Sequence, residues 1–129
     1  MKLPDLHDLD AAGVHEQHAP AEAIADASAS AKLKYFAVDL GKADSKFALL
    51  DALAHGLALP PHFGRNWDAL ADSLEDDDII GKHGAVVRLA HGAAYRKAHA
   101  HDWQTLEEIL DEATEFWKER HVPFWVFVA

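Results

Sequence analysis

A row of acidic residues follows a loop containing proline and glycine near the middle of the chain. Asp68, Asp72 and Glu75 recur at spacings of four and three residues, which places their side chains on one face of a helix. Three further aspartates, at positions 76 to 78, extend the negative charge past that helix. Like charges at these spacings destabilise the helix that carries them. The row therefore indicates either a surface that attracts cations or a solvated acidic helix face.

The same carboxylates allow an enzymatic interpretation. His62 lies six residues before Asp68 across the loop, so it could shuttle protons while Asp68 and Asp72 act as general acid and base. However, no serine has the setting of an activated nucleophile, and the chain has no cysteine. The glycine–lysine pairs at positions 41–42 and 81–82 lack the surrounding pattern of a phosphate-binding loop. We therefore predict that the chain is not an enzyme and needs no cofactor.

Histidines raise the question of a metal site. The chain has ten of them, and the alternation of His99 and His101 before Asp102 could ligate zinc from a strand. This stretch follows Arg96 and Lys97 in a predicted loop, and the sequence places no second pair of ligands near it. We predict no metal site and interpret these histidines as surface residues of a polar loop.

Composition limits the classes of function. A chain of 129 residues, half of them hydrophobic, predicts a single domain with its own core. The 22 acidic residues exceed the 12 lysines and arginines, giving a net charge of −10. This charge argues against binding to nucleic acid or to an anionic membrane. It indicates either a basic protein partner or a surface whose charge serves solubility alone.

Three features of the sequence bear on location. The absence of cysteine excludes a disulfide-stapled extracellular scaffold. No apolar stretch approaches the roughly 18 residues that a membrane-spanning helix needs. The start, MKLPDLHDLDAAG, lacks the basic and apolar regions of a secretion signal. We therefore expect a cytoplasmic protein.

The elements that must hold the acidic row begin with a strand and two helices. The stretch 33–40 (LKYFAVDL) mixes aromatic and branched residues and predicts a strand. Asp44 or Ser45 can cap the next helix, whose apolar residues recur at helical spacing: Phe47, Leu50, Ala54 and Leu57. A second, short helix is expected to begin at Asn66 or Trp67, with Trp67, Leu70 and Leu74 toward the core.

The C-terminal half predicts a strand at 85–90 and then a long helix capped by Asp102. One stripe of this helix is apolar, comprising Trp103, Leu106, Leu110, Ala113 and Trp117. The final run PFWVFVA is too short for a helix and is typical of a strand buried on both faces, as in a parallel sheet. Together these elements predict a small α/β domain with a three-stranded parallel sheet and crossover helices.

The first 31 residues differ in composition from the rest. They are rich in alanine, histidine and acids, and they contain no aromatic residue of the Phe, Tyr or Trp type. Pro20 and Glu22 could open a short helix in which Ile24 is the only large apolar residue. We interpret residues 1–31 as an N-terminal extension, either frayed or a weakly docked helix, and residues 32–129 as the domain.

The loop and short helix also share a spaced motif. It consists of leucine–proline, an aromatic residue, glycine, asparagine, aspartate–alanine–leucine and a second aspartate, here Leu59, Pro60, Phe63, Gly64, Asn66, Asp68, Ala69, Leu70 and Asp72. This motif resembles that of the barstar family, intracellular protein inhibitors of secreted microbial ribonucleases. The order of elements from Tyr35 to the C-terminus resembles the family as well.

The resemblance implies a mechanism and a set of partner-binding residues. In the family, the loop and helix, residues 60–78 here, block the active-site cleft of the ribonuclease with carboxylates that mimic RNA phosphates. By position, Asp72 would enter the catalytic centre and Asp68 would pair with a neighbouring cation. The remaining implied contacts are Gly64, Asn66, Trp67, His62, Glu75 and Asp76. A basic secreted or toxin ribonuclease is the implied partner, bound by a free monomer in a 1:1 complex.

Several positions depart from the family pattern. Ala71 stands where the best-known members carry an exposed tryptophan, and His62 stands where they carry a contacting tyrosine. The acidic run 76–78 replaces an aromatic contact, and Phe116 rather than Glu115 aligns with a contributing glutamate, so Glu115 is assigned no role. The electrostatic part of the site is thus kept while its aromatic packing is changed. The alternative function is an acidic adaptor that regulates another basic protein through the same helix face.

Overall fold

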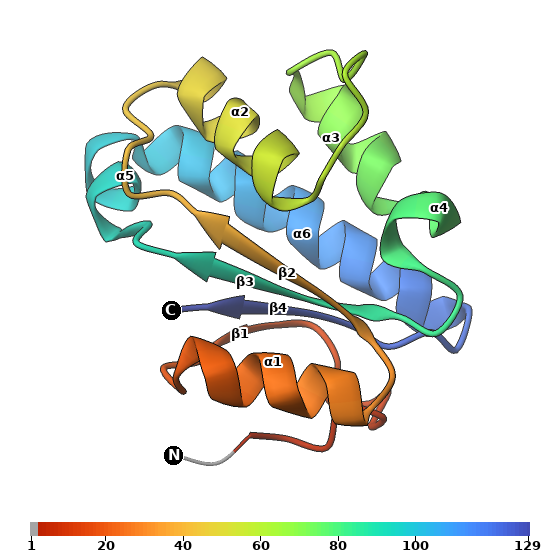
Figure 1. Ribbon diagram of the computed structural model, residues 1–129. Helices are drawn as coiled ribbons and strands as arrows, with labels where there is room; N and C mark the ends of the chain where they lie inside the picture. Colours follow the sequence, from red (N-terminus) through yellow and green to blue (C-terminus); the bar gives the residue numbers. More distant parts are fainter. Residues whose placement is uncertain (1–2) are drawn as a thin grey trace.

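The computed structural model describes residues 3–129, in which one to three helices separate each strand from the next along the chain (Figure 1). In chain order these are β1 (Val14–Glu16), α1 (Ala21–Ser30), β2 (Lys34–Asp39), α2 (Lys46–Gly56), α3 (Trp67–Leu74), α4 (Asp77–Ile80), β3 (Ala85–Ala90), α5 (Ala93–Ala98), α6 (Ala100–Glu119) and β4 (Phe124–Val128). The predicted α/β class with parallel strands is confirmed.

The sheet has four parallel strands in the order β1-β4-β3-β2, so the prediction of three strands is wrong. One row of paired residues crosses the whole sheet, from Val14 through Val126 and Val87 to Phe36. The strand missed is β1, which has only three residues and lies in the alanine- and acid-rich segment. Its formation depends on pairing with the edge of β4, a long-range interaction that local sequence pattern does not reveal.

Helices cover both faces of the sheet. In Figure 1, α2, α3 and α6 lie on one side and α1 on the other. The strands accordingly contribute alternate residues to two hydrophobic clusters: Val38, Val87, Leu89, Phe124 and Val126 face one side, and Val86, Trp125 and Phe127 face the other. The first four residues of β4 are all at most 1% exposed, which confirms the prediction of a strand buried on both faces.

The N-terminal segment supplies much of the second cluster. Ile24 of α1 is fully buried there, together with Leu6 and Leu33. The indole nitrogen of Trp125 donates a hydrogen bond of 2.9 Å to the backbone oxygen of Leu6. The backbone nitrogen of Val126 donates to the oxygen of Gly13 at 3.0 Å. This segment therefore forms the covering layer of one sheet face.

The region before α6 differs from the sequence prediction. Residues 93–98 form α5 rather than a loop, and α6 begins at Ala100, so Asp102 is not its cap. The Asp102 carboxylate instead accepts a hydrogen bond of 2.9 Å from the hydroxyl of Tyr95. Burial raises the pKa of the Tyr95 phenol, and the bond to Asp102 raises it further. The predicted core positions of Trp103, Trp117 and Trp125 are confirmed.

Helix α2 begins as predicted, and of the four residues that the spacing placed on the core side, Leu50, Ala54 and Leu57 are buried and Phe47 is not. Ser45 caps it, because its hydroxyl accepts a hydrogen bond from the backbone nitrogen of Ala48 at 3.1 Å. The buried residues of the helix are Leu49, Leu50, Leu53 and Ala54. Phe47, which the spacing placed on the core side, is 65% exposed. It lies in the first turn at the edge of the buried stripe, where periodicity alone does not decide burial.

Candidate functional site

The side chain of Asn66 holds the loop before α3 to the first turn of that helix through two hydrogen bonds. The Oδ1 of Asn66 accepts a hydrogen bond of 2.8 Å from the backbone nitrogen of Ala69, and its Nδ2 donates to the oxygen of Gly64 at 3.1 Å. A Cβ on Gly64 would lie 2.9 Å from that Nδ2, so glycine permits this close approach. The prediction that the helix begins at Asn66 or Trp67 is confirmed. The start of α3 is therefore fixed by the motif residues themselves.

An ion pair between Arg65 and Asp51 connects the same loop to α2. The Nε and Nη2 atoms of Arg65 both lie 2.9 Å from the Oδ1 of Asp51, and Nη1 donates to the oxygen of Phe63 at 3.2 Å. Arg65 has a φ of 43°, in the left-handed region that costs energy for a residue other than glycine. Sequence reasoning missed this pair because its members lie on different elements, 14 residues apart.

The inner side of α3 is anchored in the core. Leu70 and Leu74 are buried, and Trp67 and Ala71 are half-buried. The indole nitrogen of Trp117 in α6 donates a hydrogen bond of 2.7 Å to the backbone oxygen of Leu74. This bond satisfies a carbonyl in the last turn of α3, which has no partner inside the helix. Capped at one end and bonded to α6 at the other, α3 is a rigid support for its outer side chains.

The predicted carboxylates lie on the outer side of α3 and just beyond its end. Asp68 and Asp72 belong to α3, whereas Glu75 is its C-cap and Asp76 is the N-cap of α4. All four are exposed, and we call these four residues the acidic face. Among residues 3–129, no ion pair involves any of them. The Oδ1 of Asp76 accepts a hydrogen bond from the backbone nitrogen of Asp78 and so caps α4, while the other three side chains are free of hydrogen bonds within the described chain. Their charge is therefore available to an external cation.

The other predicted contact residues adjoin the acidic face in sequence. His62, Gly64 and Asn66 are exposed in the loop, and Trp67 is half-buried at the start of α3. The Nζ of Lys46 on α2 lies 5.6 Å from the centroid of the Trp67 ring. On α6, Glu115 is exposed, while Phe116 is half-buried beneath Arg120, whose guanidinium carbon is 3.5 Å from its ring centroid.

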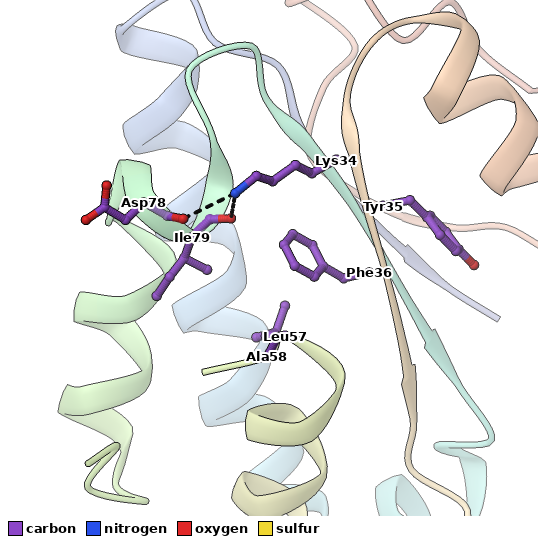
Figure 2. Close-up of a pocket in the computed structure, with 7 residues that line it drawn as sticks. All are labelled: Lys34, Tyr35, Phe36, Leu57, Ala58, Asp78 and Ile79. Carbon is purple, nitrogen blue, oxygen red and sulfur yellow. Dashed lines mark hydrogen bonds between the residues drawn. The ribbon is translucent and has the colours of Figure 1, made fainter. Parts of the chain in front are cut away.

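The short helix α4 is held against the edge of the sheet. Figure 2 shows Lys34 of β2 reaching across a pocket of about 290 Å³ toward Asp78 and Ile79. Its Nζ donates hydrogen bonds to the backbone oxygens of Asp78 at 3.2 Å and of Ile79 at 3.0 Å. Because these bonds use the backbone of Asp78, its carboxylate remains exposed beside those of Asp76 and Asp77. The acidic run after α3 is thus fixed in place without being neutralised.

The geometry bears on the rival interpretations as well. Within the described chain, no hydrogen bond joins His62 to Asp68 or Asp72, the three groups of the enzymatic interpretation. No group of three His, Cys, Asp or Glu side chains in residues 3–129 could hold a metal ion. None of the helices described there combines the length and apolar character that a membrane span requires.

The described chain is a parallel α/β domain, and it displays carboxylates without ion-pair partners on a helix that is capped and anchored. The protein is therefore a small domain with a preformed acidic surface. Residues 33–129 match the model of the family described as Barstar (barnase inhibitor). The chain belongs to the barstar family, and the resemblance noted from its motif is confirmed. Members of this family are inhibitors rather than enzymes. No curated protein matches the chain.

The family match begins at Leu33. It therefore includes β2, β3, β4 and every helix on the acidic side of the sheet, but it leaves out β1 and α1. The layer that covers the second face of the sheet is built from residues outside the matched span.

Proposed function

We propose that this protein inhibits a basic ribonuclease by inserting its acidic face into the cleft that holds RNA phosphates. The observation that carries the proposal is a set of exposed carboxylates, unpaired within the described chain, on a rigid helix that bears the family motif. Asp72 enters the catalytic centre as a phosphate mimic, and Asp68 pairs with a neighbouring cation. His62, Gly64, Asn66 and Trp67 lie against the enzyme, with Glu75 and Asp76 at the end of the contact.

Preorganisation explains why such a helix can bind tightly. A carboxylate forms its strongest hydrogen bonds with an arginine or lysine side chain that approaches in a fixed geometry. Because the cap at Asn66 and the bond from Trp117 already hold α3, little backbone entropy is lost when Asp68 and Asp72 meet the enzyme. The inhibitor then needs no cofactor and carries out no reaction.

Net charge should accelerate the encounter. A protein of charge −10 is attracted to a basic enzyme over distances comparable with the Debye length. We expect the association rate constant to fall by about tenfold or more as salt rises from low to high ionic strength. Stopped-flow mixing at several salt concentrations measures this, and a rate indifferent to ionic strength would contradict the proposed electrostatic steering.

The experiment that tests the function is a titration of ribonuclease activity with the full chain, over a panel of basic microbial ribonucleases. We expect one enzyme to lose activity stoichiometrically, with the endpoint at one equivalent. Asp72→Ala should abolish this endpoint. Asp26→Ala is the matched control, because Asp26 is an exposed aspartate of α1 on the opposite side of the sheet. Inhibition that survives Asp72→Ala would remove Asp72 from the site while leaving the function in place.

A second candidate function is that of a cytoplasmic acidic adaptor, which regulates a different basic protein through the same face. The acidic run at positions 76–78 favours it, because the best-known members of the family carry an aromatic contact there and a different partner would explain the change. Failure to inhibit every enzyme of the panel would favour the adaptor. Affinity capture from the native host, compared with Asp72→Ala bait, would then identify its partner.

A further inference from the structure

One large hydrophobic side chain is exposed on the same side of the molecule as the acidic face. Among residues 3–129, Phe47 is the only large hydrophobic residue classed as exposed, with 65% of its surface accessible. Single exposed apolar residues are common on proteins. Phe47 is distinguished by its neighbour Arg65, which belongs to the loop of the proposed binding site.

Two contacts between aromatic and cationic side chains join the first turn of α2 to that site, and one of them involves Phe47. The guanidinium carbon of Arg65 lies 5.9 Å from the centroid of the Phe47 ring, and Arg65 immediately precedes the Asn66 cap. Lys46, the neighbour of Phe47 on α2, lies over the ring of Trp67. Because Asp51 holds Arg65 in place, the Phe47 ring rests beside a fixed group. The first turn of α2 is therefore continuous with the start of the acidic face.

The acidic face lacks the apolar component that stable interfaces contain. Its four side chains are all carboxylates, and Ala71, which lies between two of them in sequence, is half-buried and small. Protein–protein interfaces concentrate aromatic residues at their centre, where charged residues are depleted. The residues that dominate binding are typically aromatic side chains or arginines seated in pockets of the partner. Among the described residues on this side of the molecule, Phe47 is more exposed than the half-buried Trp67 and Phe116, so it is the aromatic side chain best placed for such a role.

We propose that Phe47 is an apolar anchor that extends the binding surface onto α2 and enters a pocket beside the cationic cleft of the target ribonuclease. This inference rests on the proposed function, whose partner it describes more closely. Lys46 places a positive charge beside Phe47, whereas the charge of Arg65 is paired with Asp51. The complementary pocket is therefore apolar and bordered by a carboxylate of the enzyme, next to the basic groups that meet Asp68 and Asp72. Phe47 then determines which basic ribonuclease is inhibited.

The size of the effect follows from the exposed surface. Burying a whole phenylalanine side chain in a partner, when about two thirds of it is exposed beforehand, strengthens binding by about 5- to 30-fold. Phe47→Ala should raise the inhibition constant by that factor, mainly through faster dissociation. The melting temperature should change little, because the side chain contributes little to the core.

The test uses the full chain and a ribonuclease that it inhibits. Inhibition constants, dissociation rates and melting temperatures are measured for the wild type, Phe47→Ala, Phe47→Leu and Asp72→Ala. His18→Ala is the matched control, since it removes an exposed ring, 57% accessible, from the segment between β1 and α1. We expect Phe47→Leu to retain most of the affinity. Phe47→Ala should bind about 5- to 30-fold more weakly, and the salt dependence of its association rate should be unchanged. His18→Ala should bind as the wild type does.

The outcomes separate the two proposals. An inhibition constant for Phe47→Ala within twofold of the wild type, together with loss of inhibition in Asp72→Ala, overturns the anchor and leaves the proposed function standing. A weakening that His18→Ala reproduces also overturns the anchor. If the wild type inhibits no basic ribonuclease, the proposed function and the anchor that rests on it both fail.

Discussion

The asparagine that caps α3 links the stability of this protein to its proposed activity. Replacing Asn66 by alanine removes the 2.8 Å hydrogen bond to the backbone nitrogen of Ala69 and the bond to the oxygen of Gly64. Loss of an N-cap side chain costs about 1 kcal/mol, within a range of about 0.5–2 kcal/mol. With only eight residues, α3 has few other internal hydrogen bonds to hold its first turn, which carries Asp68.

The free energy lost when the cap is removed should also weaken binding to the ribonuclease. If the first turn frays in Asn66→Ala, the partner must reorder it, and about 1 kcal/mol corresponds to an inhibition constant about fivefold higher. Asn66→Asp is the informative control. It keeps an oxygen that can accept from the backbone nitrogen of Ala69, and it adds a negative charge at the helix N-terminus, worth about 0.3–1 kcal/mol. It loses the bond from the Nδ2 atom to the oxygen of Gly64, so its stability should lie between that of Asn66→Ala and that of the wild type.

Urea unfolding followed by tryptophan fluorescence measures the stability of the three proteins, and titration of ribonuclease activity measures their inhibition. We expect Asn66→Ala to be less stable than the wild type by about 1 kcal/mol and Asn66→Asp to be less stable by a smaller amount. An unfolding free energy for Asn66→Ala within about 0.3 kcal/mol of the wild type would refute the role of the cap. A loss of inhibition equal in Asn66→Ala and Asn66→Asp would show that the amide contacts the partner directly.

Three further substitutions test other parts of the structure. Trp117→Phe removes the donor to a backbone oxygen of α3 and should lower the unfolding free energy by about 1–3 kcal/mol; an unchanged melting temperature would contradict the anchoring of α3. Ile24→Ala empties a fully buried site and should cost about 2–5 kcal/mol in urea unfolding, whereas no loss would show that α1 does not stabilise the sheet. The Gly41 amide and the His91 ring hold the pKa of Asp39 below its usual value, so this carboxylate stabilises the fold above its unfolded pKa, and the contribution is lost as pH falls through the folded pKa. Asp39→Asn should therefore flatten the loss of stability below about pH 4, and an identical acid profile would contradict this.

Elements with a strong local pattern could be predicted from the sequence. The strand at 85–90 and the C-terminal strand consist of branched and aromatic residues between clear boundaries, and both are confirmed. The cap at Asn66 was identifiable because capping is a local interaction between neighbouring residues. By contrast, β1 has three residues of mixed polarity and exists through pairing with β4. Helix α5 was missed because its six residues include two cations that suggested a loop.

The acidic face was predictable in part for the same reason. The spacing of Asp68 and Asp72 places them on one side of a helix whatever the tertiary structure, whereas Glu75, expected on the same face, lies just past the helix end as its C-cap. These carboxylates have no ion-pair partners elsewhere in residues 3–129. This follows from long-range packing, which the spacing of residues in the sequence does not describe. The exposure of Phe47 and the pairing of Arg65 with Asp51 depend on how α2 packs beside the loop, so the sequence could not indicate either one.

The most direct test of the central claim is the form of inhibition, measured against RNA concentration with a ribonuclease that the protein inhibits. If Asp72 occupies the phosphate site, inhibition is competitive, and the apparent inhibition constant rises in proportion to substrate above its KM. Asp72→Asn, which keeps the shape but removes the charge, should then weaken inhibition by about 30-fold or more, while Asp26→Asn should not. Inhibition that is independent of substrate concentration, or as strong in Asp72→Asn as in the wild type, would contradict the claim.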